Sequence, residues 1–323
     1  MKAIVYTEYG PPDVLQLKEV EKPASIEDEV LIKVCASSIN TADWYLLRGD
    51  PFMVRFDAGL QKPKRTVLGA DVAGQVEAVG KYITQFQPGD EVFGDISECG
   101  LGGFAEYVSV PENALTLKPA NISFMEAAAV PMAGVTALQG LREKGQIRAN
   151  QKVLIHGASG GVGTFAVQIA KSFGAEVTAV CSTGKMDMLR SIGADHVIDY
   201  TKEDFTQNGK RYDLIIGANG YRSLSDYKRA LSADGRYVCT GGSTKQIFES
   251  ILLGGLMTVN GNRKIINLYS KPNKKDLVFM NELLEAGKVK PVMDKSYTLN
   301  EVPEAFRYFG AGHVGGKVVI THS

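Results

Sequence analysis

The sequence predicts an α/β protein in which a doubly wound parallel sheet is inserted into a β-rich domain. Three observations predict this fold. Strand patterns separated by Gly and Pro turns fill about the first 120 residues, and apolar runs alternate with helical segments from residue 152 onward. The tail, from residue 295, returns to a strand, helix, strand pattern that is too short to fold alone. We therefore expect the tail to complete the first domain, with a cleft between the two domains.

Composition favours a two-domain protein without a nucleic-acid or membrane partner. A length of 323 residues suggests two domains, and a hydrophobic content of 44% is enough for two cores. The formal net charge is zero, which does not favour a polyanion or a lipid surface as partner. No targeting segment precedes the first predicted strand and no apolar run reaches membrane-spanning length, so we expect a cytoplasmic protein. The cysteines are scattered, which is typical of reduced thiols: Cys35, Cys99, Cys181 and Cys239.

Alternation of apolar and polar residues predicts the strands of the first domain. They span residues 2–7, 29–36, 73–79, 91–94 and 103–110, and a helix spans residues 41–47. Ser123 and Glu126 form a capping-box pattern, which predicts the start of a helical stretch to about residue 144.

Short apolar runs between helical segments predict the buried strands of the parallel sheet. They span residues 153–156, 177–180, 196–198, 214–217, 236–240 and about 256–260. After them we expect a helix at 276–286 that Gly287 ends, a strand at 295–299, a helix at 301–309 and a strand at 316–320. The expected domains are residues 1–122 with 264–323, and residues 123–263.

A glycine-rich turn joins the first strand of the parallel sheet to the helix that follows it. Gly157, Gly160 and Gly163 allow the tight turn, the close approach of a phosphate and the packing of the helix on the strand. The first helical turn offers unpaired N–H groups and a positive dipole end to an anion. The strand–turn–helix context favours a dinucleotide site over a bare structural turn. The expected contacts are Gly157, Ser159, Gly160, Gly161, Val162 and Gly163.

The end of the second strand of this sheet favours NADPH over NADH. NAD sites place Asp or Glu there to hold the ribose 2′-OH, whereas this segment contains Ser182, Thr183 and Lys185 and no acid. Hydroxyls and a cation suit a 2′-phosphate, although Lys185 is also consistent with a solvated charge at a helix start. Ligands bind at the carboxyl ends of parallel strands, so we expect further coenzyme contacts at Ala218, Asn219, Gly241 and Gly242.

Over nearly its whole length the chain resembles the medium-chain dehydrogenase/reductases, in their zinc-independent quinone oxidoreductase branch. The segments that carry the resemblance are residues 38–45, 68–74, 89–94, 102–107, 127–139, 157–163 and 315–320. Asp43-Trp44 and residues 217–220 are similar to the chloroplast envelope quinone oxidoreductase-like group. The resemblance implies a GroES-like catalytic domain, residues 1–122 and 264–323, and a Rossmann NADPH-binding domain, residues 123–263.

The resemblance also implies site residues. Asn40 and Tyr45 match residues at the nicotinamide end of the site, where each side chain is able to donate to a substrate oxygen. A helix cap for Asn40 and a packing role for Tyr45 are the alternatives. Tyr200 matches a tyrosine near the 2′-phosphate. Thr136 matches a threonine near the nicotinamide, or is an ordinary helix threonine.

Zinc-dependent relatives bind their metal through a first cysteine, a Gly-His-Glu element and a later cysteine. Here the corresponding positions are Asn40 and Gly69-Ala70-Asp71, and no cluster of four close cysteines exists, so no metal is expected. Without a metal, a conjugated acceptor is easier to reduce than a simple carbonyl, because the charge spreads to the carbonyl oxygen. We expect hydride transfer to a quinone or an α,β-unsaturated carbonyl compound, a small electrophile. The alternatives are a nucleotide-binding sensor or structural protein, or a simple alcohol dehydrogenase.

Two further segments lead to expectations. Residues 251–259 are apolar and should end in an edge strand, which favours a homodimer. Residues 50–56 mix apolar and basic groups, and are consistent with a substrate cover or with an ordinary surface loop.

Overall fold

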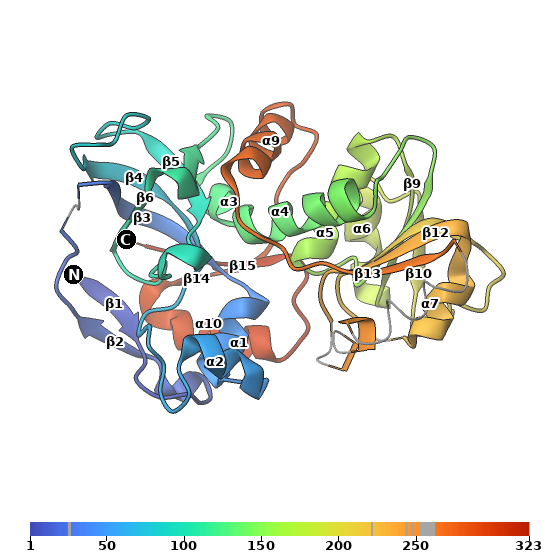
Figure 1. Ribbon diagram of the computed structural model, residues 1–323, viewed down its shortest axis with the longest axis horizontal. Helices are drawn as coiled ribbons and strands as arrows, with labels where there is room; N and C mark the ends of the chain where they lie inside the picture. The colour runs from blue at the N-terminus through green and yellow to red at the C-terminus, as the bar shows by residue number, and fades with distance from the viewer. Residues whose placement is uncertain (25–26, 221, 243–244, 247–248, 252–261, 323) are drawn as a thin grey trace. The chain divides into compact units, whose positions relative to one another are not determined.

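The chain passes from one structural unit to another and back (Figure 1). The computed structural model describes residues 1–24, 27–220, 222–242, 245–246, 249–251 and 262–322. The first unit comprises Met1–Met132, Pro272–Glu285 and Pro291–Ser323. The second comprises Ala133–Lys271 and Ala286–Lys290. The expected strand at about 256–260, and with it the expected dimer edge, lies outside the described residues.

A seven-stranded sheet built around one long strand forms the first unit. That strand, β3(Glu29–Ile39), pairs antiparallel with β4(Asp71–Val79), β6(Tyr107–Pro111) and the late strand β15(Lys317–Thr321). The tail therefore returns to the first unit, as the sequence predicts. The remaining strands are β5(Glu91–Asp95), β7(Leu115–Leu117) and β14(Met293–Thr298), with a separate hairpin of β1(Lys2–Val5) and β2(Gln16–Glu19).

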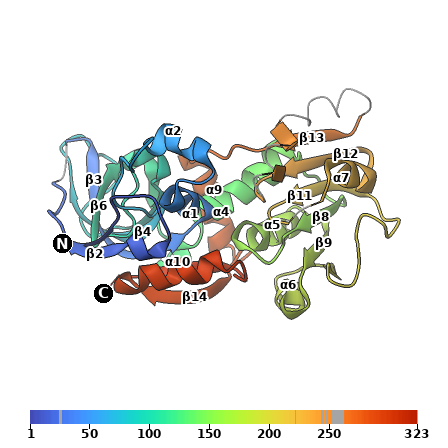
Figure 2. The same ribbon diagram turned by 90° about the horizontal axis from the view of Figure 1, so that it is seen from below.

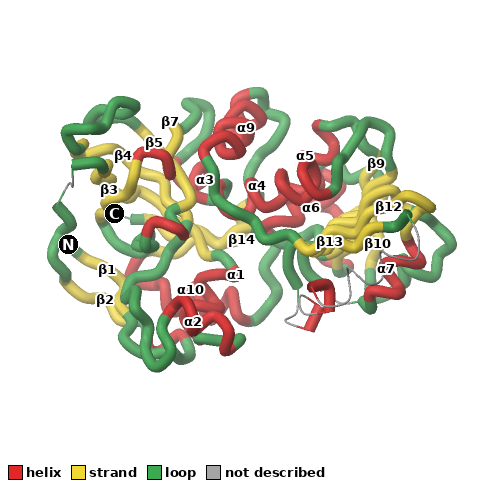
Figure 3. Tube along the Cα trace, in the orientation of Figure 1, coloured by secondary structure: helices red, strands yellow, loops and turns green. Residues whose placement is uncertain are grey.

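The core of the first unit includes aromatic rings from two helices in contact, α1(Thr41–Arg48) and α10(Val302–Gly310), both labelled in Figure 1 and drawn as helix in Figure 3. The Trp44 and Phe306 rings stack with centroids 6.5 Å apart, and Phe104 meets Phe306 edge-on at 5.8 Å. The other helices are α2(Arg55–Ala58), α3(Phe124–Ala128) and α9(Lys274–Glu285), and α4(Pro131–Leu138) begins at the unit boundary.

Among the described residues, six parallel strands form the sheet of the second unit, in the order β10-β9-β8-β11-β12-β13. Figure 2 shows β13, β12, β11, β8 and β9 following one another in this order. They are β8(Lys152–His156), β9(Glu176–Cys181), β10(His196–Asp199), β11(Tyr212–Gly217), β12(Leu231–Cys239) and β13(Lys264–Asn267). Counted along the chain this order is 3-2-1-4-5-6, the order of dinucleotide-binding sheets, which reverses direction between β8 and β11. Helix α5(Gly161–Ser172) packs on β8 and β9, α6(Met186–Ser191) on β10, and α7(Leu224–Ala230) on β12.

Several boundaries differ from those that the sequence predicts. The helical stretch to residue 144 is interrupted before Pro131, because proline disfavours helical backbone in the residue before it, and it ends as a π-helix, η5(Gln139–Lys144). The strand expected at 103–110 begins only at Tyr107. The units divide after Met132 and after Lys271 instead of at 122 and 264, since the short strand β13 pairs with β12. None of the described helices is both long and apolar enough to cross a membrane.

The aromatic core provides a test of the fold. Phe306 is fully buried, so Phe306→Ala should lower the free energy of unfolding by about 3–5 kcal/mol. Urea unfolding followed through Trp44, the chain's one tryptophan, measures it. Tyr82→Ala, at a side chain that is 62% exposed, should change stability by no more than about 0.5 kcal/mol. Equal effects of the two substitutions would contradict the described core.

Candidate active site

The glycine turn after β8 has the geometry that its sequence predicts. Gly157 has a φ of +78°, and a Cβ there would lie 2.3 Å from the Asn219 carbonyl oxygen. A Cβ on Gly163 would lie 2.3 Å from the Gly157 oxygen. These two glycines are therefore required by the protein's own backbone.

Gly160 is different, because nothing in the turn excludes a side chain there. It is the N-cap of α5 with a φ of −81°, and a Cβ at this position would lie 3.8 Å from its nearest neighbour, the Gly157 oxygen. The open position at Gly160 and the N-terminus of α5 together match the arrangement by which dinucleotide sites bind a pyrophosphate, whose close approach the absence of a Cβ permits.

The ends of β11 and β12 lie against the same turn. The Ala218 and Asn219 N–H groups donate to the His156 carbonyl oxygen at 2.9 and 3.2 Å. A Cβ on Gly241 would lie 2.6 Å from the Ala218 oxygen, and Gly242 has a φ of +121°. The structure thus brings the predicted residues of the glycine turn together with 218, 219 and 241, at the point where the strand order reverses.

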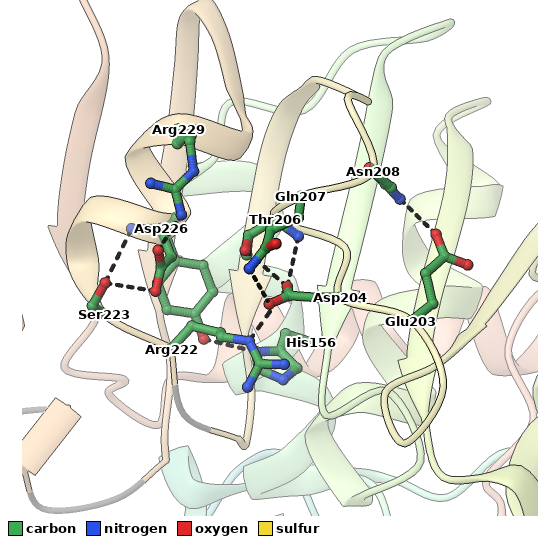
Figure 4. Close-up of polar contacts among 11 residues, drawn as sticks. His156, Glu203, Asp204, Thr206, Gln207, Asn208, Arg222, Ser223, Asp226 and Arg229 are labelled. Carbon is green, nitrogen blue, oxygen red and sulfur yellow. Dashed lines mark hydrogen bonds and ion pairs between the residues drawn. The ribbon is translucent and has the colours of Figure 1, made fainter.

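A buried, uncharged histidine, His156, directly precedes this turn at the end of β8. The His156 Nδ1 lies 2.7 Å from the Tyr227 hydroxyl oxygen. Burial, followed by the charge of Arg222, lowers the pKa of His156 to about 4. Figure 4 shows Arg222 beside His156 and directed to Asp204, whose carboxylate lies 3.6 Å from Nε of Arg222. The imidazole is therefore neutral near pH 7, and His156 adds no positive charge at the end of β8.

The end of β9 forms a second group with the end of β10. Ser182 is the N-cap of the short helix η6(Thr183–Lys185), and the Lys185 N–H donates to the Ser182 oxygen at 3.0 Å. The Tyr200 N–H donates to the Cys181 oxygen at 3.0 Å, and the Tyr200 side chain is 52% exposed. The residues predicted for a 2′-phosphate therefore share one loop region.

Sequence reasoning missed an acid in this region. Asp199, at the end of β10, is in register with Cys181 and accepts hydrogen bonds from the Thr183 hydroxyl and from Thr201. These bonds lower the pKa of Asp199 to about 2. The Thr183 hydroxyl, expected to face a phosphate, instead donates to this carboxylate. Parallel pairing of two adjacent strand ends was the signal that would have found Asp199.

In the first unit, Asn40 is buried at the N-terminus of α1 inside a network of charged groups. Its Nδ2 donates to Asp71 Oδ2 at 2.9 Å, and its Oδ1 accepts from Lys317 Nζ at 2.5 Å. Lys317 and Asp71 form an ion pair at 3.2 Å. Both were within segments that carry the family resemblance, but their side chains were not predicted as site residues.

Two further buried carboxylates surround this network. Asp43 accepts from the N–H groups of Asn40 and Gly69, at 2.9 and 3.1 Å, so its carboxylate has a structural role at the start of α1. Burial, and then the neighbouring Asp71 charge, raise the pKa values of Asp43 and Asp95 to about 7. Hydrogen bonds from Asn40 and Gly69 oppose the rise at Asp43. Asp71 is the one of the three carboxylates with an ammonium partner among the described contacts.

Tyr45 and Thr136 are the other two residues that the family resemblance associates with the nicotinamide. Tyr45 is half-buried on α1, and burial, with the nearby Asp50, raises the pKa of its hydroxyl, which therefore stays protonated and able to donate. Among the contacts of the described residues, none joins the Asn40 and Tyr45 side chains. Thr136 is buried in α4 and belongs to the second unit. In the predicted loop at 50–56, Phe52, Met53 and Phe56 are more than half exposed.

The positions that bind zinc in metal-dependent relatives carry an unsuitable donor set. By the family resemblance, Asn40 stands in place of a thiolate and Ala70 in place of an imidazole, and the Asp71 carboxylate is already paired with the Lys317 ammonium. No group of three or more His, Cys, Asp or Glu side chains with the spacing of a metal site occurs in the described part of the chain. The residues present do not fit a zinc ion.

Known proteins share both units of this chain. The alcohol dehydrogenase GroES-like domain matches residues 26–120, and the zinc-binding dehydrogenase family matches residues 192–320. The 2-methylene-furan-3-one reductase of Solanum lycopersicum is 40% identical over 99% of this chain and 79% of its own length. The chloroplastic NADPH-dependent alkenal/one oxidoreductase of Arabidopsis thaliana is 37% identical, again over 99% and 79%.

Two further comparisons cover nearly complete chains. The chloroplast envelope quinone oxidoreductase homolog of Arabidopsis thaliana is 31% identical over 99% of this chain and 98% of its own. The solved structure of the quinone oxidoreductase from Coxiella burnetii has a TM-score of 0.87 at 29% identity, with 99% of each chain covered.

Parallel-sheet geometry, a glycine cradle and a GroES-like unit define a nicotinamide-dinucleotide oxidoreductase of two domains. The chain belongs to the medium-chain dehydrogenase/reductase family, in its quinone oxidoreductase branch. The family resemblance seen in the sequence is thereby confirmed.

Substitutions of two glycines in this turn should have different effects, one on the stability of the protein and the other on coenzyme binding. Gly157→Ala should lower the free energy of unfolding by about 1–3 kcal/mol, because of its positive φ and the contact with Asn219. Gly160→Ala should leave the stability of the free protein within about 0.5 kcal/mol of the wild type. It should nevertheless weaken binding of the reduced dinucleotide at least about tenfold.

Thermal unfolding without coenzyme and fluorescence titration with coenzyme measure the two effects. Undiminished coenzyme affinity in Gly160→Ala would show that the phosphates do not approach this glycine.

Proposed function

We propose that this protein is an NADPH-dependent reductase of α,β-unsaturated carbonyl compounds and quinones that works without zinc. The observation that carries the proposal is the polar network at Asn40, where an amide and a paired carboxylate replace metal ligands. The names of the relatives support the same acceptors, since they include an alkenal/one oxidoreductase and quinone oxidoreductases.

The chemistry of a conjugated acceptor suits hydrogen-bond donors better than a metal. When bound, the reduced nicotinamide supplies a hydride, which adds to the β-carbon of an enone. Negative charge then develops on the carbonyl oxygen, where a protonated Tyr45 hydroxyl and the Asn40 amide are able to donate. The α-carbon takes its proton from water, so that the chain needs no dedicated acid.

Selectivity for NADPH rests on the residues that follow β9 and β10. Lys185 supplies a cation, Ser182 a hydroxyl and Tyr200 an exposed phenol. The Asp199 carboxylate nearby is satisfied by Thr183 and Thr201 and paired with Lys202 at 3.6 Å, which reduces its repulsion of a 2′-phosphate.

Steady-state oxidation of NADPH tests the function. We expect turnover with alkenals, enones and quinones, and negligible oxidation of simple alcohols with NADP⁺. Efficient alcohol oxidation together with inertness toward every conjugated acceptor would refute the proposal. Coenzyme binding without turnover of any acceptor would favour a nucleotide sensor instead.

Removal of the cation in the β9 loop should change coenzyme preference. Lys185→Ala should raise KM for NADPH about tenfold and change KM for NADH little, because only NADPH carries the 2′-phosphate. The exposed Lys210, in the same unit, provides a charge-matched control, and Lys210→Ala should change neither constant. An equal rise for both coenzymes would remove Lys185 from the phosphate site.

Loss of the phenolic hydroxyl should slow the chemical step. Tyr45→Phe should lower kcat for an enone at least about tenfold, with KM for NADPH unchanged, because a donor to the developing oxyanion is lost. The control is Tyr82→Phe, at an exposed tyrosine of the same unit. Full turnover in Tyr45→Phe would reduce Tyr45 to a packing residue.

A further inference from the structure

The amide of Asn40 is held at both of its ends. Lys317 Nζ donates to Oδ1 at 2.5 Å, and Nδ2 donates to Asp71 Oδ2 at 2.9 Å. The backbone N–H of Asn40 is fixed as well, by Asp43 Oδ2 at 2.9 Å. The side chain therefore has little freedom to turn.

The groups that hold Asn40 are themselves fixed. Lys317 and Asp71 are 3% and 0% exposed, and they come from the first positions of β15 and β4. Asp71 also accepts from Ser38 Oγ at 2.8 Å and from the Met132 N–H at 2.9 Å. Rigid backbone elements thus anchor both charges.

The two charges select one orientation of the amide. In that orientation the carbonyl oxygen faces an ammonium and the NH₂ group faces a carboxylate. A half-turn about the last side-chain bond would place the oxygen against the carboxylate and the NH₂ group against the ammonium. Hydrogen bonds to ionised groups are the strong ones, so the half-turn exchanges two strong attractions for two repulsions.

The fixed orientation leaves one proton available. Nδ2 carries two protons, and the hydrogen bonds of the described residues use one, to Asp71. The ammonium on Oδ1 and the carboxylate on Nδ2 also polarise the amide, and hydrogen bonds in such a chain strengthen one another.

We propose that Lys317, together with Asp71, is a positioning residue that fixes Asn40 as a hydrogen-bond donor and directs its second Nδ2 proton to the carbonyl oxygen of the acceptor. The proposal rests on the proposed reductase function. In this arrangement a buried lysine has its effect on the substrate through Asn40 and not by contact.

A double-mutant cycle tests the proposal. Lys317→Met with Asp71→Asn removes both charges together, because removal of one alone leaves a buried unpaired charge. We expect this pair of substitutions to lower kcat for an enone about fivefold to tenfold, and Asn40→Ala to lower it about a hundredfold. KM for NADPH should stay within about twofold in both. In the Asn40→Ala background, the paired substitutions should cause no further loss.

A matched control is present in the same unit. Lys118 is another lysine with a largely covered side chain, 5% exposed and 3.1 Å from Glu91, and it has no contact with Asn40 among the described interactions. Lys118→Met should lower the melting temperature and leave kcat unchanged. If the paired variant does not fold, Lys317→Arg replaces it in the same cycle, with a smaller loss of kcat that again disappears in the Asn40→Ala background.

The failure of the inference differs from the failure of the proposed function. An equal loss of kcat in the wild-type and Asn40→Ala backgrounds would overturn the positioning role, since Lys317 would then act independently of Asn40. Absence of turnover in the wild-type protein with every conjugated acceptor would instead overturn the reductase function on which the inference rests.

Discussion

The ion pair between Lys317 and Asp71 is the constraint on which the structure around Asn40 in the first unit depends. A buried ion pair adds little net stability, because the cost of desolvation offsets most of the attraction. The ion pair instead fixes the positions of the residues around it, since neither buried charge tolerates the loss of its partner. The pair forces β15, β4 and the start of α1 into one relative position. Asn40 lies between the two charges, and its amide has one favourable orientation as a result.

The polar sites of the two units consist of different chemical groups. In the second unit the polar site consists mainly of backbone groups. They are the turn at Gly157, which only glycine permits, the His156 carbonyl oxygen, which accepts hydrogen bonds, and the first N–H groups of α5. In the first unit side-chain charges dominate, with three buried carboxylates near one ammonium. A backbone cradle suits an invariant diphosphate, whereas side-chain donors suit an acceptor whose oxygen gains charge only during reaction.

Local sequence was sufficient for most of the parallel sheet, because its buried strands are apolar runs and Gly157 marks the turn. Local sequence did not predict β13 and β2. Both strands are short and contain few buried residues, so neither the spacing of apolar residues nor the composition identifies them. Asn40 and Tyr45 were recognisable by resemblance. Their partners were not, because Lys317 lies 277 residues from Asn40, and only the pairing of β15 with β3 brings the two together. Asp199 was missed for the same reason, as its relation to Thr183 depends on strand register.

The late position of β15 affects the order in which the protein acquires structure during synthesis. Residues 152–267 contain the strands β8 to β13 of the parallel sheet, so these strands are able to pair before β15 has left the ribosome. The first unit is different, because β3 lacks one neighbour and Asp71 lacks its counter-ion until residues near 320 emerge. Until then Asp71 remains hydrated and the edge of β3 is unprotected. The parallel sheet of the second unit is thus able to form before the first unit is complete, although it is encoded in the middle of the chain.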